Sequence, residues 1–172
     1  VAPKTGVTIG DRNGVLVSAG GGAVGAALIE TAMAARHLSK RYADHPWDIV
    51  TGPHFPADAF SRLGKNLPGG VTLHRFLPDF RDRMAQCCVS VSQAGYNTLM
   101  DVLATRTASV MVPFADGGES EQSERAAILA SKGVLSLLNP DDLTPQSLIN
   151  QIDQAKNPAK LDISLDGAGI TA

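Results

Sequence analysis

Residues 15–25 read Val15-Leu-Val-Ser-Ala-Gly-Gly-Gly-Ala-Val-Gly25, a short apolar run that passes directly into a glycine-rich turn. The apolar run is typical of a buried parallel strand. Behind the turn, the spacing of apolar residues predicts a helix at about residues 24–39. A strand, a tight turn and a helix in this order indicate an α/β fold.

The same unit recurs about six times along the chain. Strands are predicted at Val15 to Ser18, Asp48 to Thr51, Val71 to Leu73, Cys88 to Val91, Ser109 to Val112 and Val134 to Leu137. Helices are predicted at about 24–39, 56–64, 79–86, 97–105, 121–132 and 144–155. This strict alternation with short connections predicts a doubly wound α/β domain, whose parallel sheet of six strands is covered on both faces. Ligands of such sheets bind outside the carboxyl ends of the strands.

Length and composition fit one domain over residues 1–172, with 44% hydrophobic and 19% charged residues. A net charge of -2 argues against nucleic acid as a partner, and no apolar stretch is long enough to cross a bilayer. Cys87 and Cys88 are neighbours and form no disulfide framework, which favours the cytoplasm. The chain opens with Val1 and closes on a string of small residues, so we expect a fragment of a longer protein.

Gly20, Gly22 and Gly25 satisfy the dinucleotide-binding fingerprint between a strand and a helix. That fingerprint also needs an acidic residue at the end of the second strand, whereas Asp48 stands at its beginning. NAD is therefore disfavoured, while direct contact with a phosphate and a turn that only allows close packing both stay open. The four histidines lack metal-ligand spacing, and motifs for zinc hydrolysis, P-loop chemistry and a nucleophile elbow are absent from the sequence.

The segment Ser90-Val-Ser-Gln-Ala-Gly-Tyr-Asn-Thr98 leaves the fourth strand and enters a helix. Gly95 would let the main chain approach a phosphate, and Asn97 or Thr98 is expected to cap the helix. Asp101 follows in the same helix. Its carboxylate either binds a ribose diol or only interacts favourably with the positive end of the helix, and the residues alone leave both readings open.

The segment Val112-Pro-Phe-Ala-Asp-Gly-Gly-Glu-Ser-Glu-Gln122 is long, polar and again runs from a strand end to a helix start. Glu119 and Gln122 are candidates for binding sugar hydroxyls, whereas Glu121 is interpreted as a solvated loop residue. Phe76, after the third strand, is either a core aromatic or presents itself to a flat base.

Four segments together resemble the C-terminal, donor-binding half of a GT-B glycosyltransferase. They are Val15-Leu-Val-Ser-Ala-Gly-Gly-Gly22, Arg75-Phe-Leu-Pro-Asp-Phe80, Ser92-Gln-Ala-Gly-Tyr-Asn-Thr-Leu-Met-Asp101, and Val112-Pro-Phe114 followed by Glu119-Ser-Glu-Gln122. The nearest resemblance is to predicted glycosyltransferases of family 28, related to the enzyme that adds N-acetylglucosamine to the peptidoglycan lipid precursor. It covers about residues 10–140.

The resemblance implies a Rossmann-like half-domain that binds a nucleotide diphosphate sugar, commonly a UDP-sugar, without metal or cofactor. It assigns the donor cleft to Gly20, Gly21 and Gly22, the base loop to Phe76 and Leu77, the diphosphate turn to Ser92, Gly95, Asn97 and Thr98, the ribose to Asp101, and the sugar to Glu119 and Gln122. Asp101 stands where the family usually has Glu, and Arg106 where it often has Gly.

The resemblance further implies that the acceptor site and catalytic base lie in an N-terminal half that this sequence does not contain. We therefore expect no catalytic residue here, no transfer by this chain alone, and membrane contact only through that other half. Two alternatives remain: half of a nucleotide-sugar epimerase, and a non-catalytic nucleotide-binding or interaction module with the same fold.

Overall fold

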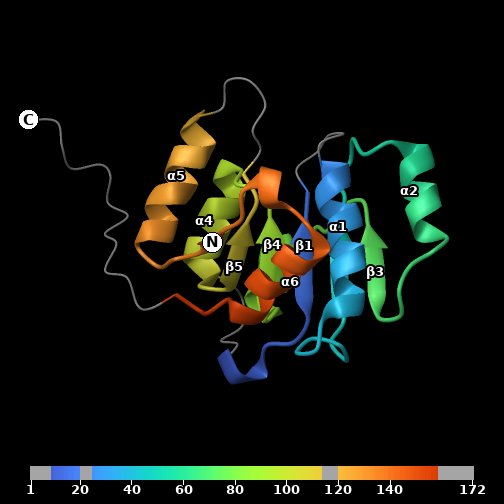
Figure 1. The fold of residues 1–172 in the computed structure, drawn as a ribbon, viewed down its shortest axis with the longest axis horizontal. Helices are drawn as coiled ribbons and strands as arrows, with labels where there is room; N and C mark the ends of the chain where they lie inside the picture. The colour runs from blue at the N-terminus through green and yellow to red at the C-terminus, as the bar shows by residue number, and fades with distance from the viewer. Residues whose placement is uncertain (1–8, 20–24, 114–119, 159–172) are drawn as a thin grey trace, which may run out of the picture.

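Six short strands form one sheet in the order β3-β2-β1-β4-β5-β6, and every pair of neighbours is parallel (Figure 1). The computed structural model describes residues 9–19, 25–113 and 120–158. The strands are β1 (Val15–Ser18), β2 (Trp47–Val50), β3 (Val71–His74), β4 (Val89–Ser92), β5 (Ala108–Met111) and β6 (Ser136–Leu137). All their carboxyl ends therefore lie at one edge of the sheet.

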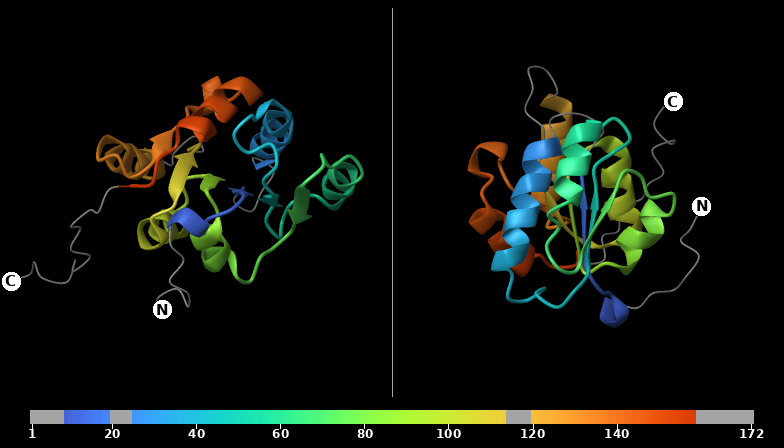
Figure 2. Two further views of the ribbon diagram at one scale, coloured as in Figure 1. Left: turned by 90° about the horizontal axis from the view of Figure 1, so that it is seen from below. Right: turned by 90° about the vertical axis from the view of Figure 1, so that its right-hand side faces the viewer.

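Helices cover the sheet in two layers, which Figure 2 separates. The helices are α1 (Gly25–Leu38), α2 (Ala57–Gly64), α3 (Phe80–Gln86), α4 (Tyr96–Thr105), α5 (Ser120–Ser131) and α6 (Pro145–Gln154), with short 3-10 turns η1 (Ile9–Asp11) and η2 (Pro140–Asp142). α1, α2 and α6 lie on one face, and α3 and α4 lie on the other. This confirms the predicted doubly wound, Rossmann-like α/β fold.

The predicted elements are shifted by a residue or two at several ends, and β6 differs most. The sequence predicts a strand from Val134, but only Ser136 and Leu137 pair with β5. Gly133 has a left-handed φ of 69° and donates to the carbonyl of Ala130. The N–H of Val134 bonds to the carbonyl of Leu129, so this residue belongs to the cap that follows α5 and does not begin the strand.

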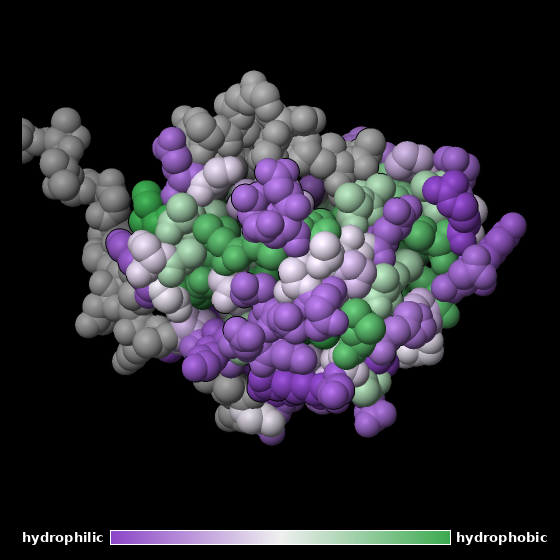
Figure 3. Space-filling model, in the orientation of Figure 1, coloured by the Kyte–Doolittle hydropathy of each residue, from purple (hydrophilic) through white to green (hydrophobic). Residues whose placement is uncertain are grey.

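The core consists of two clusters of buried side chains, one on each side of the sheet. β4 illustrates the division, because Val89 and Val91 belong to the cluster under α1 and α6. Ser90 and Ser92 alternate with them, are buried, and lie toward α3 and α4. The solvent-facing sides of α6 and η2 are mainly hydrophilic (Figure 3), as expected of a helix with one apolar side.

The C-terminus of α4 is held by residues from both ends of the described chain. Arg12 donates to the carbonyls of Thr105, at 2.8 Å, and of Arg106, at 3.3 Å. Asn157 donates to the same Arg106 carbonyl at 3.1 Å. These bonds satisfy carbonyls that a helix end leaves without intrahelical partners.

Arg106 itself adopts a left-handed conformation with a φ of 53°. Glycine adopts this conformation most easily because it has no Cβ to clash, which agrees with the glycine that the resemblance implies at this position. An arginine at this position pays a backbone cost of about 1–2 kcal/mol.

Replacing Arg106 by glycine and by alanine separates this backbone cost from the side-chain contacts. Both variants lose the side chain, but only glycine relieves the left-handed strain. Relief of the strain favours the glycine variant, and the larger entropy of glycine in the unfolded chain offsets part of this gain. We therefore expect Arg106→Gly to be more stable than Arg106→Ala by roughly 0.5–1 kcal/mol in urea unfolding. An alanine variant as stable as the glycine variant would contradict the strain.

Candidate functional site

β1 and β4 are neighbours at the centre of the sheet, and their last residues, Ser18 and Ser92, lie side by side in register. The strand order changes direction between them, because the chain builds β2 and β3 on one side and β5 and β6 on the other. Ligands of doubly wound sheets bind at such a switch point. The turn with Gly20, Gly21 and Gly22 follows Ser18, but those three residues lie outside the described part of the chain.

The second turn runs from Ser92 to the start of α4. The Ser92 side chain points into the protein, where its hydroxyl contacts Met111 Sδ at 3.1 Å. Its predicted role at the diphosphate can thus involve only the main chain in this conformation. The chain then reaches Gly95, whose N–H donates to the carbonyl of Gln93 at 2.9 Å.

α4 begins at Tyr96, and its N-cap residue is Gly95, which makes no side-chain capping bond. The prediction that Asn97 or Thr98 caps the helix is wrong, because both residues already lie inside its first turn. A cap must precede the helix with extended backbone, as Gly95 does with φ −65° and ψ 146°. α6 shows the contrast: the Thr144 hydroxyl accepts from the Ser147 N–H at 3.1 Å.

Gly95 is not required by the fold. Its φ of −65° suits any residue, and an added Cβ would meet nothing closer than Thr98 Oγ1 at 3.9 Å. Gly14 is the opposite case: its φ is 87°, and an added Cβ would lie 2.7 Å from the carbonyl oxygen of Pro46. The structure thus gives Gly14 an internal reason to be glycine and gives Gly95 none.

Asp101 lies further along α4 and is ion-paired with Arg81 of α3, with 3.0 Å between Oδ1 and Nε. Its side chain is 24% exposed. Burial raises the pKa of the Asp101 carboxyl above its ordinary value of 3.8, and the positive charge of Arg81 partly opposes this rise. The sequence did not predict this ion pair. It left open only two roles for the carboxylate, ribose binding and a favourable interaction with the helix dipole.

The predicted base loop divides into an exposed and a buried residue. Phe76 is 68% exposed, so its ring is accessible, whereas Leu77 is buried in the cluster of Met84 and Leu99. Arg75 fixes the start of this loop, because its guanidinium donates to the Phe55 carbonyl at 2.9 Å. Of the two predicted contacts, only Phe76 offers its side chain to a ligand.

The predicted sugar-binding residues are only partly described. Glu119 lies outside the described residues, and Gln122 lies in the first turn of α5. Sequence reasoning passed over Tyr96, which is 58% exposed at the start of α4 and has the Arg125 guanidinium 5.7 Å from its ring centroid. The signal that could have identified Tyr96 as a candidate is its position between Gly95 and Asn97, two residues of the predicted diphosphate turn.

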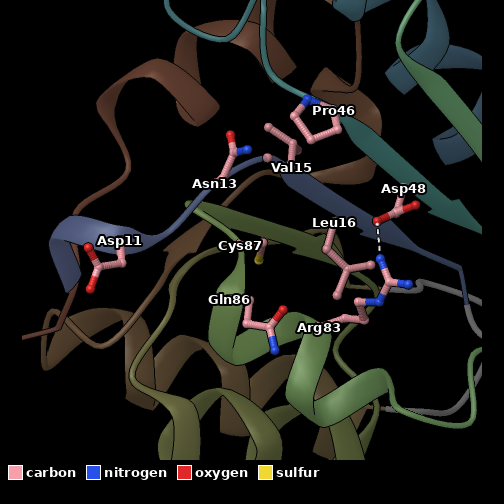
Figure 4. Close-up of a pocket in the computed structure, with 10 residues that line it drawn as sticks. Asp11, Asn13, Val15, Leu16, Pro46, Asp48, Arg83, Gln86 and Cys87 are labelled. Carbon is pink, nitrogen blue, oxygen red and sulfur yellow. Dashed lines mark hydrogen bonds and ion pairs between the residues drawn. The ribbon is translucent and has the colours of Figure 1, made fainter. Parts of the chain in front are cut away.

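A pocket of about 430 Å³ lies at the opposite edge, at the amino ends of β1 and β2 (Figure 4). There Asp48 contacts Nη1 of Arg83 at 3.3 Å and Nε2 of His74 at 2.7 Å. The predicted position of Asp48 at the start of its strand is confirmed, so this carboxylate lies at the edge of the sheet opposite the switch point. Across the described residues, His, Cys, Asp and Glu side chains form no cluster suited to a metal ion.

No helix among the described residues has the length and apolar character needed to cross a membrane.

Cys87 and Cys88 are both free, as predicted. Burial raises the pKa of the Cys87 thiol to about 12, so this thiol is not a nucleophile at neutral pH.

Solved structures with this fold include glycosyltransferases. The calicheamicin glycosyltransferase CalG4 matches with a TM-score of 0.65 and 20% identity, over 89% of this chain and 35% of that chain. MurG of Acinetobacter baumannii matches with a TM-score of 0.63 and 23% identity, over 83% and 40% of the two chains. The six-stranded parallel sheet with its flanking helices is thus the Rossmann-like architecture found in part of the GT-B glycosyltransferases.

Comparison of the sequence with known families identifies the family of the chain. The glycosyltransferase family 28 C-terminal domain matches residues 16–163, and the chain belongs to this family, which confirms the resemblance. A curated relative from Methylibium petroleiphilum is 30% identical over 107 residues, which cover 62% of this chain and 29% of that protein. It is named UDP-N-acetylglucosamine--N-acetylmuramyl-(pentapeptide) pyrophosphoryl-undecaprenol N-acetylglucosamine transferase. The chain therefore spans less than a third of that relative.

The raised pKa of Asp101 predicts that its charge opposes folding at neutral pH. A carboxyl with a raised folded-state pKa stabilises the fold fully below its unfolded value, here near 3.8, and loses this contribution as pH rises through the folded-state value. We expect Asp101→Asn to be at least as stable as the parent in urea at pH 7. The advantage should shrink toward pH 3.8. A variant that is less stable at pH 7 and recovers in acid would show the reverse sign.

Proposed function

We propose that this chain binds the nucleoside diphosphate part of a nucleotide sugar and is the donor-binding half of a hexosyltransferase. The observation that supports this most directly is Gly95. Glycine loses more conformational entropy on folding than other residues do, so a glycine that neither the backbone conformation nor the packing requires lowers stability. Its presence then needs a reason outside the chain. Close approach of a phosphate to the main chain at the start of α4 provides that reason.

The surroundings of Gly95 suit an anion. The first N–H groups of a helix have no partners within it, and the helix dipole adds positive potential at the same end. α4 leaves this end without a side-chain cap and has its other end bonded to Arg12 and Asn157. Phe76 and Asp101 follow as the proposed contacts for the base and the ribose, and Glu119 and Gln122 as those for the sugar.

We propose a UDP-sugar as the donor, because the curated relative is named for transfer from UDP-N-acetylglucosamine. We also propose that residues 1–172 form one domain of a longer, two-domain enzyme whose N-terminal half supplies the acceptor site and the catalytic base. An acceptor hydroxyl would then attack the anomeric carbon, and the diphosphate would leave toward α4. Fixed N–H donors stabilise the charge that develops on the leaving group, so this scheme needs neither a metal nor a cofactor.

The pair of free cysteines supports a reducing compartment, and we propose the cytoplasm. Contact with a membrane would come through the acceptor-binding half, if the acceptor is a lipid.

Calorimetric titration of the chain with UDP, dTDP, GDP, ADP and NAD tests the proposal. We expect UDP to bind, and Gly95→Ala to weaken this binding at least about tenfold, because the added methyl group blocks the approach of the phosphate to the main chain. The same variant should unfold at the parent's urea concentration or slightly above it, since alanine lowers the entropy of the unfolded chain.

Gly69→Ala is the matched control, because Gly69 also has open space where a Cβ would be added but lies before β3, at the other edge of the sheet. It should change neither binding nor stability by more than a small amount. Silence from all five nucleotides, or equal binding of UDP by the parent and Gly95→Ala, would count against the proposal.

A further inference from the structure

Arg81 joins two segments that sequence reasoning treats separately. It lies in the first turn of α3, four residues after Leu77 and the proposed base loop. Its side chain reaches α4, which packs beside α3 on the same face of the sheet (Figure 2). There it meets Asp101, the residue proposed to bind ribose. Arg81 therefore connects the proposed base loop to the carboxylate that is proposed to bind the ribose.

The contact between these side chains is an ion pair. Arg81 Nε lies 3.0 Å from Asp101 Oδ1, and the two side chains are 37% and 24% exposed. A guanidinium at this distance favours the charged form of the carboxylate and restricts where the carboxylate can move. With Oδ1 held by Arg81, Oδ2 is the oxygen that remains for a ligand. The carboxylate is thus ordered before any nucleotide arrives, which lowers the entropy lost on binding.

Asp101 has a short side chain that reaches only a little way from α4, so a small shift in its orientation would cost much of a contact with a ligand. Its half-buried position also disfavours the charged form that accepts hydroxyl hydrogens. An adjacent guanidinium answers both difficulties.

We propose that Arg81 is a positioning residue for nucleotide recognition: by holding Oδ1 of Asp101, it directs Oδ2 to the ribose hydroxyls and so sets the preference of the site for ribonucleotides over deoxyribonucleotides. The inference rests on the proposed function. It assigns Arg81 no contact with the reacting atoms.

The test compares UDP with 2′,3′-dideoxy-UDP, which keeps the base and the diphosphate but has no ribose hydroxyls. In the parent chain, we expect UDP to bind at least tenfold more tightly than the dideoxy analogue. Arg81→Met should reduce this preference to threefold or less and leave the affinity for the analogue unchanged within twofold. Arg81→Lys keeps the charge but not the planar guanidinium, so its preference should fall between the two.

Arg83→Met is the matched control. Arg83 lies on the same helix, is similarly exposed and forms its ion pairs with Asp79 and Asp48 instead of Asp101. This variant should keep the parent's preference for UDP. Urea unfolding of every variant shows whether it is folded, and Arg81→Lys carries the comparison if Arg81→Met is not.

The outcomes separate the two proposals. If the parent binds no UDP, the proposed function is overturned and this inference falls with it. If UDP binds and the Arg81 variants keep the parent's preference, the inference alone is overturned. Equal weakening of UDP and its dideoxy analogue would also overturn it, because that result assigns Arg81 to the general structure of the site and not to the ribose.

Discussion

The parallel pairing of β1 with β4 is the interaction on which the rest of the structure depends. It places strands that are more than seventy residues apart in sequence next to each other, with Val15 opposite Val89 and Ser18 opposite Ser92. Parallel pairs need crossover connections, and right-handed crossovers send the helices of the two halves to opposite faces. The two turns that follow these strands consequently leave the sheet at one point. Everything proposed about nucleotide binding follows from this meeting of strand ends.

The fold was predictable from the sequence because it rests on repeated local signals. Each strand is a short apolar run, each helix has its own periodicity, and their strict alternation admits few topologies. The site was predictable only in outline. The N-cap of α4 is Gly95, two residues before Asn97 and three before Thr98. The ion pair of Arg81 with Asp101 follows from the packing of α3 on α4, and no periodicity in one segment reports a contact with another.

The two ends of α4 are treated differently, and the difference is electrostatic. Arg12 and Asn157 occupy the carbonyls at its C-terminus, where positive charge is favourable. The N-terminus has a glycine, Gly95, as its N-cap residue, and this residue makes no side-chain capping bond. Asp101 adds a carboxylate whose charge is disfavoured by burial and kept by Arg81. Under the proposed function, the glycine without a structural need and the charge held against burial both exchange stability for ligand binding.

The packing of α6 also determines when this domain can fold during its own synthesis. Leu148, Ile149 and Ile152 complete the cluster that contains Val89 and Val110, yet α6 is made after both of those strands. A nascent chain that has reached the end of α5 therefore carries a nearly complete sheet, in which the part of one apolar face that α6 covers is still open to water. Such surfaces bind chaperones or one another. A ribosome that stalls between α5 and α6 would release a chain prone to aggregate, although its proposed nucleotide contacts had all been synthesised.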